Sequence, residues 1–289
     1  MFSFLLFLSV LTVDMLRIFW YYIISNILTR DYSNEIGKIL RNIFIKMGPT
    51  GIKIGQVLSH RIDILPQNMC VILSKLTDNL PGLGINEEKK LLNYAKTVVN
   101  YNSPPIKIGA GCIAVTYLTT VNNNDVVMKI KRPNIDKDLE ISFNRVYNIL
   151  YLLSKFGLIN LNEKIDKIRD SLFRQTDFYY ELSELEYFYK RYNQSNLFEK
   201  IIIPKPYPEL SDKNIITLEY LRGNNVDNLE KKQKEDIANT LWDFCFHSSF
   251  IDGHWHSDLH KGNLLCMDDK LGIIDFGLTG SLKGFEKSI

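Results

Sequence analysis

The chain has 289 residues, of which 45% are hydrophobic and 24% charged, and its formal net charge is +2. This length allows one large or two medium-sized domains with a substantial core. The nearly balanced charge, without a basic stripe between aromatic residues, argues against a nucleic-acid partner. The four cysteines are scattered without a Cys-x-x-Cys pair, which indicates reduced thiols in an intracellular protein and no disulfide framework.

The first segment, residues 1–28, is almost entirely apolar and long enough to span a membrane once. Asp14 lies near its middle, where a charge costs about 3 kcal/mol, although Arg17 is placed one helical turn later and could pair with it. We therefore expect either a membrane anchor or a hydrophobic helix that packs on the protein or lies in the membrane interface. The basic residues that follow would leave the bulk of an anchored chain on the cytoplasmic side.

The hydrophobic spacing that follows, up to about residue 103, is that of consecutive helices, interrupted by Gly48-Pro49 and by a turn at 81–84. After Pro105 the apolar residues alternate over short runs, which predicts strands. The elements expected from there are strands at 106–110, 113–121 and 126–131, helices at 136–156 and 162–192, an extended connector at 201–208, a strand at 214–220, a helix at 231–251, and a hairpin with arms at 264–267 and 271–274.

The stretch from His256 to Gly277 carries the densest set of motifs. His256-x-Asp258 is followed five residues later by Asn263, and Asp275-Phe276-Gly277 comes directly after the hairpin. In protein kinases the spacing H-x-D-x-x-x-x-N and a following D-F-G supply a base, a metal-binding amide and a metal-binding carboxylate. The hairpin would bring Asn263 and Asp275 to the same end, where two oxygen ligands can share a magnesium ion.

The same stretch allows two other interpretations. His254, His256, Asp258 and His260 alternate, as in the sites of zinc or di-metal hydrolases. That interpretation requires ligands elsewhere and gives no reason for Asn263 or for the D-F-G motif. The other alternative is a set of incidental polar loop residues, which two linked motifs on one hairpin make less favourable.

Two further segments suit a nucleotide site. The small residues Gly109-Ala110-Gly111-Cys112 lie between two expected strands and would let the backbone approach phosphates, although an ordinary hairpin turn has the same composition. Lys129 ends a V-x-x-K strand segment like the one that carries the nucleotide-contacting lysine of kinases. Glu181, on the helix expected over 162–192, is the best candidate to pair with Lys129, although charged residues on strands and helices are more often solvated.

With these residues identified, the chain resembles the UbiB family of atypical protein-kinase-like proteins, which are linked to ubiquinone biosynthesis. The most specific part runs from Gly48 to Pro66 and matches the family's KxGQ signature and the S-x-R-x-D-x-L-P run behind it. The resemblance covers roughly residues 36–280. It also includes a strand-end lysine with a following Arg-Pro, a D-F-x-x-E helix and an H-x-D-x-H-x-G-N loop, at Lys129 to Pro133, Asp177 to Glu181 and His256 to Asn263.

The resemblance implies an α+β, protein-kinase-like two-lobed fold with an N-terminal helical KxGQ extension and a truncated C-lobe. The expected parts are a hydrophobic segment at 1–30, the extension at 34–103, an N-lobe with a helical insert at 104–221, and a partial C-lobe at 222–289. In the family the KxGQ helix folds over the active site, which disfavours ordinary protein substrates. The implied function is an ATP- and Mg²⁺-binding atypical kinase or ATPase that supports isoprenoid-quinone or other lipid metabolism at a membrane, with a lipid or quinone precursor as a further ligand.

Carried over by position, the resemblance gives each motif residue a role. Lys129 would contact the phosphates and pair with Glu181, and Asp258 would act as the catalytic base or position a water molecule. Asn263 and Asp275 would hold magnesium. The implied nucleotide-binding residues are Gly109, Ala110, Gly111 and Cys112 of the loop, Lys129, Glu219 and Leu221 near the hinge, and Lys53 and Gln56 of the KxGQ segment.

The chain departs from the family pattern in several places. Gln175 stands where the family has the acid of its E-x-D motif, Cys112 where a serine is usual, and Val115 where a glutamine is usual. Only twelve residues follow Gly277, whereas family members continue with an activation segment and further helices. We therefore expect a fragment, a split product or a subunit whose C-lobe a protein partner completes, and the alternative function is a non-catalytic, nucleotide-binding pseudokinase scaffold.

Overall fold

The computed structural model describes residues 11–22, 24, 31–78, 83–155, 157, 164–194, 198–226 and 229–282. The chain divides into two compact units. Unit 1 comprises Met1–Gly82, Ala110–Ile113 and Arg132–Phe173, and unit 2 comprises Leu83–Gly109, Ala114–Lys131 and Arg174–Ile289.

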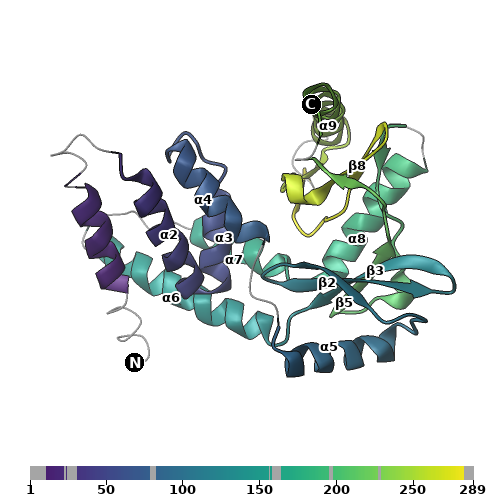
Figure 1. The fold of residues 1–289 in the computed structure, drawn as a ribbon, viewed down its shortest axis with the longest axis horizontal. Helices are drawn as coiled ribbons and strands as arrows, with labels where there is room; N and C mark the ends of the chain where they lie inside the picture. Colours follow the sequence, from purple (N-terminus) through teal and green to yellow (C-terminus); the bar gives the residue numbers. More distant parts are fainter. Residues whose placement is uncertain are drawn as a thin grey trace. The chain divides into compact units, whose positions relative to one another are not determined.

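Unit 1 is built from helices (Figure 1). They are α2 (Ser33–Met47), α3 (Pro49–Leu58), α4 (Gln67–Asp78), α6 (Ile135–Lys155) and α7 (Lys164–Arg174), the last of which reaches the unit boundary. Their shared core contains Phe44, Leu73 and Leu76. Gly48, at a φ of 84°, separates α2 from α3, and Pro49 begins α3 because its fixed φ suits the first position of a helix.

Two glycines of the KxGQ segment allow close packing between helices of unit 1. A Cβ atom on Gly55 would lie 2.4 Å from Cδ1 of Leu76, and one on Gly51 would lie 2.5 Å from the carbonyl oxygen of Phe44. Beside them, Thr50 joins α3 to α6, because its Oγ1 lies 2.8 Å from Oγ of Ser142 in the buried interface. These small residues of the segment therefore serve the packing of unit 1.

The N-terminal helix lies against the core of unit 1. Residues 11–22 are helical, and Leu11 and Ile18 pack on the core. Asp14 is buried, with Nζ of Lys46 2.6 Å from its Oδ2 and Nη1 of Arg17 3.7 Å from its Oδ1. Within the described ranges, no helix is both long and apolar enough to cross a membrane. The remainder of the expected anchor, at 1–10, 23 and 25–30, falls outside the described residues.

Unit 2 contains a four-stranded antiparallel sheet in the order β1-β2-β3-β5. Its strands are β1 (Ile106–Ala110), β2 (Ala114–Val121), β3 (Asn124–Lys131) and β5 (Ile215–Glu219). Helix α5 (Ile85–Val98) lies along one face, where the Tyr117 hydroxyl donates to Glu88 at 2.7 Å (Figure 1). Because Tyr117 pairs with Met128, the next residue, Lys129, points to the opposite face.

The described part of unit 2 holds two further sheets, one of four strands and one of two. The first has the order β4-β9-β8-β6, and in the second β7 pairs with β10. Their strands are β4 (Ile201–Ile202), β6 (Asn224–Asn225), β7 (His254–His256), β8 (Leu264–Met267), β9 (Lys270–Ile273) and β10 (Thr279–Ser281), and the associated helices are α8 (Phe178–Phe188) and α9 (Lys231–Phe246). The predicted hairpin is present as β8 and β9, with Leu264 opposite Ile273.

The single helix expected over 162–192 is wrong. The chain forms α7 and α8 with a turn between them, and residues 189–193 form a π-helical turn after α8. Asp177 caps α8, because its Oδ1 accepts hydrogen bonds from the N–H groups of Tyr179 and Tyr180, both at 3.1 Å. The short side chain of aspartate accepts hydrogen bonds from nearby backbone N–H groups, which makes this residue favourable at the start of a helix. Glu181 consequently lies in the first turn of α8.

Candidate nucleotide and metal site

A charged triad of Lys129, Glu181 and Asp275 lies in unit 2. Nζ of Lys129, on β3, is 2.6 Å from Oε1 of Glu181 on α8 and 2.8 Å from Oδ2 of Asp275, which follows β9. The Glu181 side chain is only 4% exposed and that of Lys129 19%. One ammonium group therefore holds two carboxylates from segments that lie far apart in the sequence.

The triad changes the acidity of its members. Burial raises the pKa of Glu181 to about 7, against the attraction of Lys129 and with a smaller contribution from the negative charge of Asp275. Burial acts to lower the pKa of Lys129, but the charges of Asp275 and Glu181 outweigh it and raise that pKa overall. Lys129 therefore stays cationic at neutral pH, while Glu181 is poised between its two protonation states.

This acidity predicts a pH-dependent contribution of Glu181 to stability. Its pKa is about 7 in the fold against an ordinary 4.5, so the native protein binds more protons than the unfolded chain between these values. The contribution of Glu181 to the free energy of unfolding therefore falls as the pH rises from about 4.5 to about 7. Denaturant unfolding measures this effect. Over the same pH range, the free energy of unfolding of the wild type should fall by up to about 3 kcal/mol relative to that of Glu181→Gln. A difference that does not vary with pH would contradict this, and Glu186→Gln on the same helix is the matched control.

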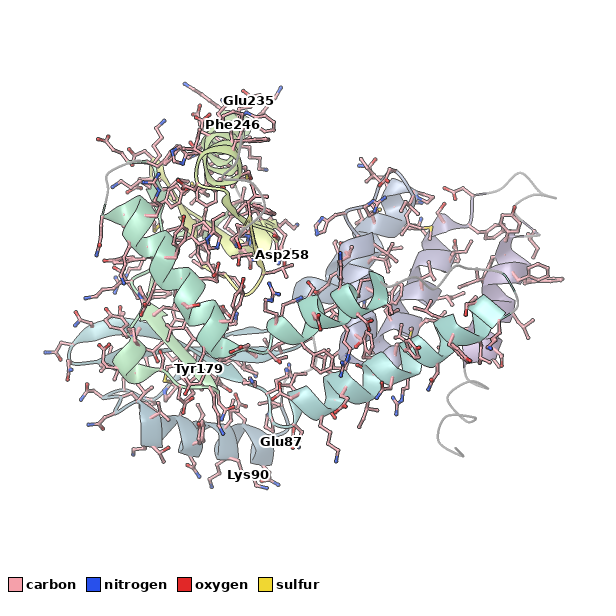
Figure 2. All side chains as sticks on the ribbon, turned by 180° about the vertical axis from the view of Figure 1, so that it is seen from behind. Glu87, Lys90, Tyr179, Glu235, Phe246 and Asp258 are labelled. Carbon is pink, nitrogen blue, oxygen red and sulfur yellow. The ribbon has the colours of Figure 1, made fainter. Side chains whose placement is uncertain are left out.

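The loop between β7 and β8 is tied to the triad by His256. Nδ1 of His256 accepts the Asp258 N–H at 3.0 Å, and Nε2 contacts the carbonyl oxygen of Asp275. Burial lowers the pKa of His256, so the ring is neutral and carries its hydrogen on Nε2, which donates to that carbonyl. Asp258 lies on this loop (Figure 2), and its side chain is 37% exposed.

Asn263 and Asp275 are the two residues whose side-chain oxygens were predicted to bind magnesium. Nδ2 of Asn263 donates to the Asp258 carbonyl at 2.9 Å, which leaves Oδ1 as the acceptor of the amide group. The Ile274 N–H donates to the Asn263 carbonyl at 3.1 Å, so the residue before Asp275 lies beside Asn263. Magnesium in proteins takes one or two such ligands and completes its shell with water and substrate phosphates. The donor set therefore fits magnesium.

The alternating histidines do not converge on a common point. His254 contacts Glu184, His256 contacts Asp258 and Asp275, and Nδ1 of His260 accepts the Gly262 N–H at 3.1 Å. Throughout the part of the chain that the structure describes, no group of three or more His, Cys, Asp or Glu side chains is arranged to hold a metal ion. The geometry thus gives no support to the zinc-hydrolase interpretation.

The other predicted binding residues are divided between the units. In unit 2, Glu219 ends β5, and its N–H donates to the Lys205 carbonyl at 2.8 Å. Leu221, two residues later, is buried. Gly109 lies in β1 of the same unit. Ala110, Gly111 and Cys112 belong to unit 1, where the Cys112 side chain joins the hydrophobic core. Lys53 and Gln56 lie on α3 of unit 1, and Nε2 of Gln56 donates to the Leu76 carbonyl at 3.0 Å. Unit 2 alone therefore brings together Lys129, Glu181, Asp258, Asn263 and Asp275.

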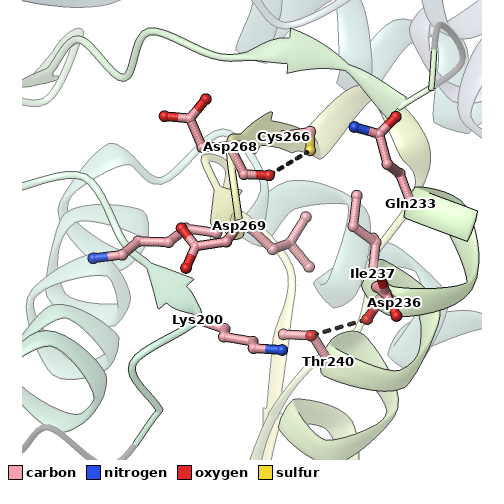
Figure 3. Close-up of a pocket in the computed structure, with 10 residues that line it drawn as sticks. Lys200, Gln233, Asp236, Ile237, Thr240, Cys266, Asp268 and Asp269 are labelled. Atoms are coloured by element: carbon pink, nitrogen blue, oxygen red, sulfur yellow. Dashed lines mark hydrogen bonds between the residues drawn. The ribbon is translucent and has the colours of Figure 1, made fainter. Parts of the chain in front are cut away.

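A small cavity lies between α9 and the turn of the β8–β9 hairpin (Figure 3). Its volume is about 100 Å³, whereas pockets for drug-sized ligands start at about 300 Å³. Burial raises the pKa of the Cys266 thiol in its wall, and the charge of Asp268 adds to the effect. The cavity can therefore hold a few water molecules beside the protonated thiol of its wall, and it is too small for a nucleotide.

Sequence reasoning missed a second cluster beside the triad. Neither Glu184 nor Thr279 is among the site residues predicted from the sequence. The structure joins them, because the Thr279 hydroxyl donates to Oε2 of Glu184 at 2.7 Å. The signal in the sequence was the spacing of Glu184 from Glu181, which places both on one face of a helix.

The antiparallel sheet, the lysine held by two carboxylates and the loop that precedes the hairpin define a protein-kinase-like domain. A family model described as the ABC1 atypical kinase-like domain matches residues 95–288. The chain therefore belongs to the ABC1 atypical kinase-like family. This match confirms both the resemblance recognised in the motifs and the predicted α+β, protein-kinase-like fold class.

Two relatives show how much of the chain is similar to known proteins. The chain is 31% identical over 258 residues to "Uncharacterized protein in hydrogenase 1 5'region" of Clostridium pasteurianum, covering 84% of this chain and 48% of that protein. It is 26% identical over 267 residues to "Protein ACTIVITY OF BC1 COMPLEX KINASE 7, chloroplastic" of Arabidopsis thaliana, covering 88% of this chain and 38% of that protein. The chain thus spans half or less of the length of these two relatives.

The fold is also similar to that of a solved Mycobacterium tuberculosis protein. That protein was determined in complex with erythromycin, and the comparison gives a TM-score of 0.59 at 19% identity. It covers 71% of this chain and 54% of that one. At this level of identity the similarity supports the fold alone.

Proposed function

We propose that the chain binds ATP together with magnesium at the charged triad and acts as an atypical kinase or ATPase. The observation that carries this proposal is the position of Lys129, 2.6 Å from Glu181 and 2.8 Å from Asp275. A lysine fixed in this way presents its charge to a nucleotide phosphate without the entropy cost of ordering a flexible side chain. Family membership supports the same conclusion.

Each residue of the site then has a task in phosphoryl transfer. Lys129 neutralises phosphate charge, and Glu181 fixes its ammonium group. Asn263 and Asp275 would hold the magnesium ion, which when bound screens the charge of the phosphate oxygens. Asp258, on the exposed part of the loop, orients the attacking hydroxyl or water. Positioning and electrostatics of this kind supply most of the catalysis in phosphoryl transfer.

Nucleotide binding by the full chain is the direct test. We expect ATP with magnesium to raise the melting temperature, and ATP with EDTA to raise it much less, because binding to the folded state stabilises it by mass action. Calorimetric titration gives the affinity under both conditions. A folded sample whose melting temperature and titration heats do not respond to ATP with magnesium would overturn the proposal.

We further propose that this activity serves isoprenoid-quinone or other lipid metabolism at a membrane. The family resemblance motivates it, and so does the apolar outer side of the N-terminal helix. The large apolar side chains exposed there are Val13, Met15, Leu16, Phe19, Trp20 and Tyr22. An apolar helix face of this kind suits the interfacial region of a bilayer. Absence of co-sedimentation with phospholipid vesicles would contradict the membrane part of this proposal.

A pseudokinase that binds nucleotide without turnover is the second candidate. The contact between Asp275 and Lys129 favours it, because a carboxylate that is already paired with a cation is a weaker ligand for a second one. Steady release of phosphate from ATP, lost in Asp258→Ala, would exclude this candidate. Binding of ATP without any phosphate release would favour it over the enzyme.

A further inference from the structure

A buried polar cluster joins α8 to the two strands that flank the catalytic motifs. Oε2 of Glu184, on α8, contacts Nε2 of His254 on β7 and accepts the Thr279 hydroxyl of β10 at 2.7 Å. The Tyr180 hydroxyl lies 2.7 Å from Oγ1 of Thr279. The single hydroxyl hydrogen of Thr279 is donated to Glu184, so the Tyr180 hydroxyl is the donor in the second bond. All four residues belong to unit 2.

The cluster is strong because it is buried. Glu184 is 6% exposed and Thr279 5% exposed. A carboxylate at such depth requires hydrogen-bond donors, and bonds to an ionised acceptor are about twice as strong as neutral ones. Here one oxygen atom receives donors from two different strands. Removing either donor would therefore loosen a specific attachment of α8 and not a general surface contact.

The attached strands lead directly to the motif residues. His254 lies two residues before His256, and Thr279 lies two residues after Gly277. Thr279 is also the register partner of His256 in the β7–β10 pair. On α8, Glu184 follows Glu181 by three residues and so shares its face of the helix. The cluster thus connects the helix that carries Glu181 with the segment that carries Asp275.

We propose that Glu184 is a positioning residue of the nucleotide site. It fixes α8 to β7 and β10, and this attachment sets the distances from Lys129 to Glu181 and to Asp275. The inference rests on the proposed binding of ATP and magnesium at the triad. Its action is indirect, because the contacts of Glu184 described above are with His254 and Thr279 and the ligand would be held by the triad.

Packing alone is the competing explanation for the same arrangement. The Tyr187 ring stacks on His254 with centroids 4.3 Å apart, and Phe276 packs on Phe188 at 4.8 Å. These apolar contacts could hold the strands without any help from Glu184. The test must therefore remove hydrogen bonds while it leaves shape and packing in place.

Thr279→Val meets this requirement, because valine has nearly the shape of threonine and lacks the hydroxyl group. Thr279→Ser restores the hydroxyl, Glu184→Leu removes the acceptor, and Glu186→Gln, which alters a partly exposed carboxylate of the same helix, is the control. Hydrogen–deuterium exchange of residues 275–282 and calorimetric titration with ATP and magnesium are measured on each full-length protein. Thr279→Val keeps the test decisive if Glu184→Leu does not fold.

We expect faster exchange of residues 275–282 and an affinity for ATP with magnesium lowered about tenfold in Thr279→Val and Glu184→Leu. Thr279→Ser should recover most of the loss, and Glu186→Gln should match the wild type. Faster exchange with unchanged affinity would overturn the positioning role, as would no change in either measurement. If the wild type itself does not bind nucleotide, the proposed function fails, while faster exchange in Thr279→Val still supports the attachment by Glu184.

Discussion

Asp275→Asn is expected to lower the affinity for ATP with magnesium on the order of 100-fold, because a metal ion contributes several kcal/mol of charge stabilisation. Asparagine has nearly the size of aspartate, so the loop keeps its shape. It lacks the negative charge that would attract magnesium in the proposed site and that lies 2.8 Å from Nζ of Lys129. Calorimetric titration with ATP, with and without magnesium, measures the effect. The loss should be concentrated in the titration that contains magnesium.

Asp269→Asn is the matched control for that change. Asp269 is exposed in the turn between β8 and β9, on the same hairpin that precedes Asp275. The Asp269→Asn substitution removes the same charge at a position outside the triad. It should leave the affinity for ATP with magnesium within about twofold of the wild type. If Asp275→Asn binds ATP with magnesium as tightly as this control, Asp275 does not hold the metal.

Lys129→Met is expected to lower the free energy of unfolding by about 3–5 kcal/mol at pH 8. Methionine fills the space of the lysine stem but leaves the buried carboxylate of Glu181 beside Asp275 without a cation. At pH 5 the loss should be smaller, because Glu181 has a raised pKa of about 7 even with Lys129 present and takes up a proton when the cation is gone. Denaturant unfolding at the two pH values measures both quantities.

Lys107→Met provides the comparison, because Lys107 lies on β1 of the same sheet with a 40% exposed side chain, 3.7 Å from Glu88. Exposed ion pairs contribute at most about 1 kcal/mol, so this variant should be nearly as stable as the wild type at both pH values. Equal stability of Lys129→Met and Lys107→Met at pH 8 would show that the triad is not a buried charge network.

Much of the local structure followed from the sequence. Strands β1, β2 and β3 lie within two residues of their expected bounds, and the turn between β2 and β3 uses Asn122 and Asn123 at φ values of 50° and 66°. The alternation of apolar residues and the asparagine turn are local signals, which sequence reasoning can read. The break between α7 and α8 was missed, because the apolar spacing continues across it and only the cap at Asp177 interrupts the helix.

The motif residues could also be recognised in the sequence, because each motif lies within a short continuous segment such as His256 to Asn263. Their contacts could not, because they depend on distances between segments. The 2.8 Å contact of Lys129 with Asp275 joins residues 146 positions apart. The burial of Cys112 in the core of unit 1 is a similar case, since composition alone suggested a phosphate loop. Tertiary packing, which leaves no local trace, decides both.

The cap at Asp177 has a consequence for how the chain tolerates change. It fixes the residue at which α8 begins, and each residue of an α-helix turns about 100° around the axis. Glu181 and Glu184 reach their partners only because each lies a set number of residues after that start. An insertion of a single residue between Asp177 and Glu181 would rotate both carboxylates away from Lys129 and Thr279 together. The starting point of one short helix thus sets the angular positions of both carboxylates around the helix axis.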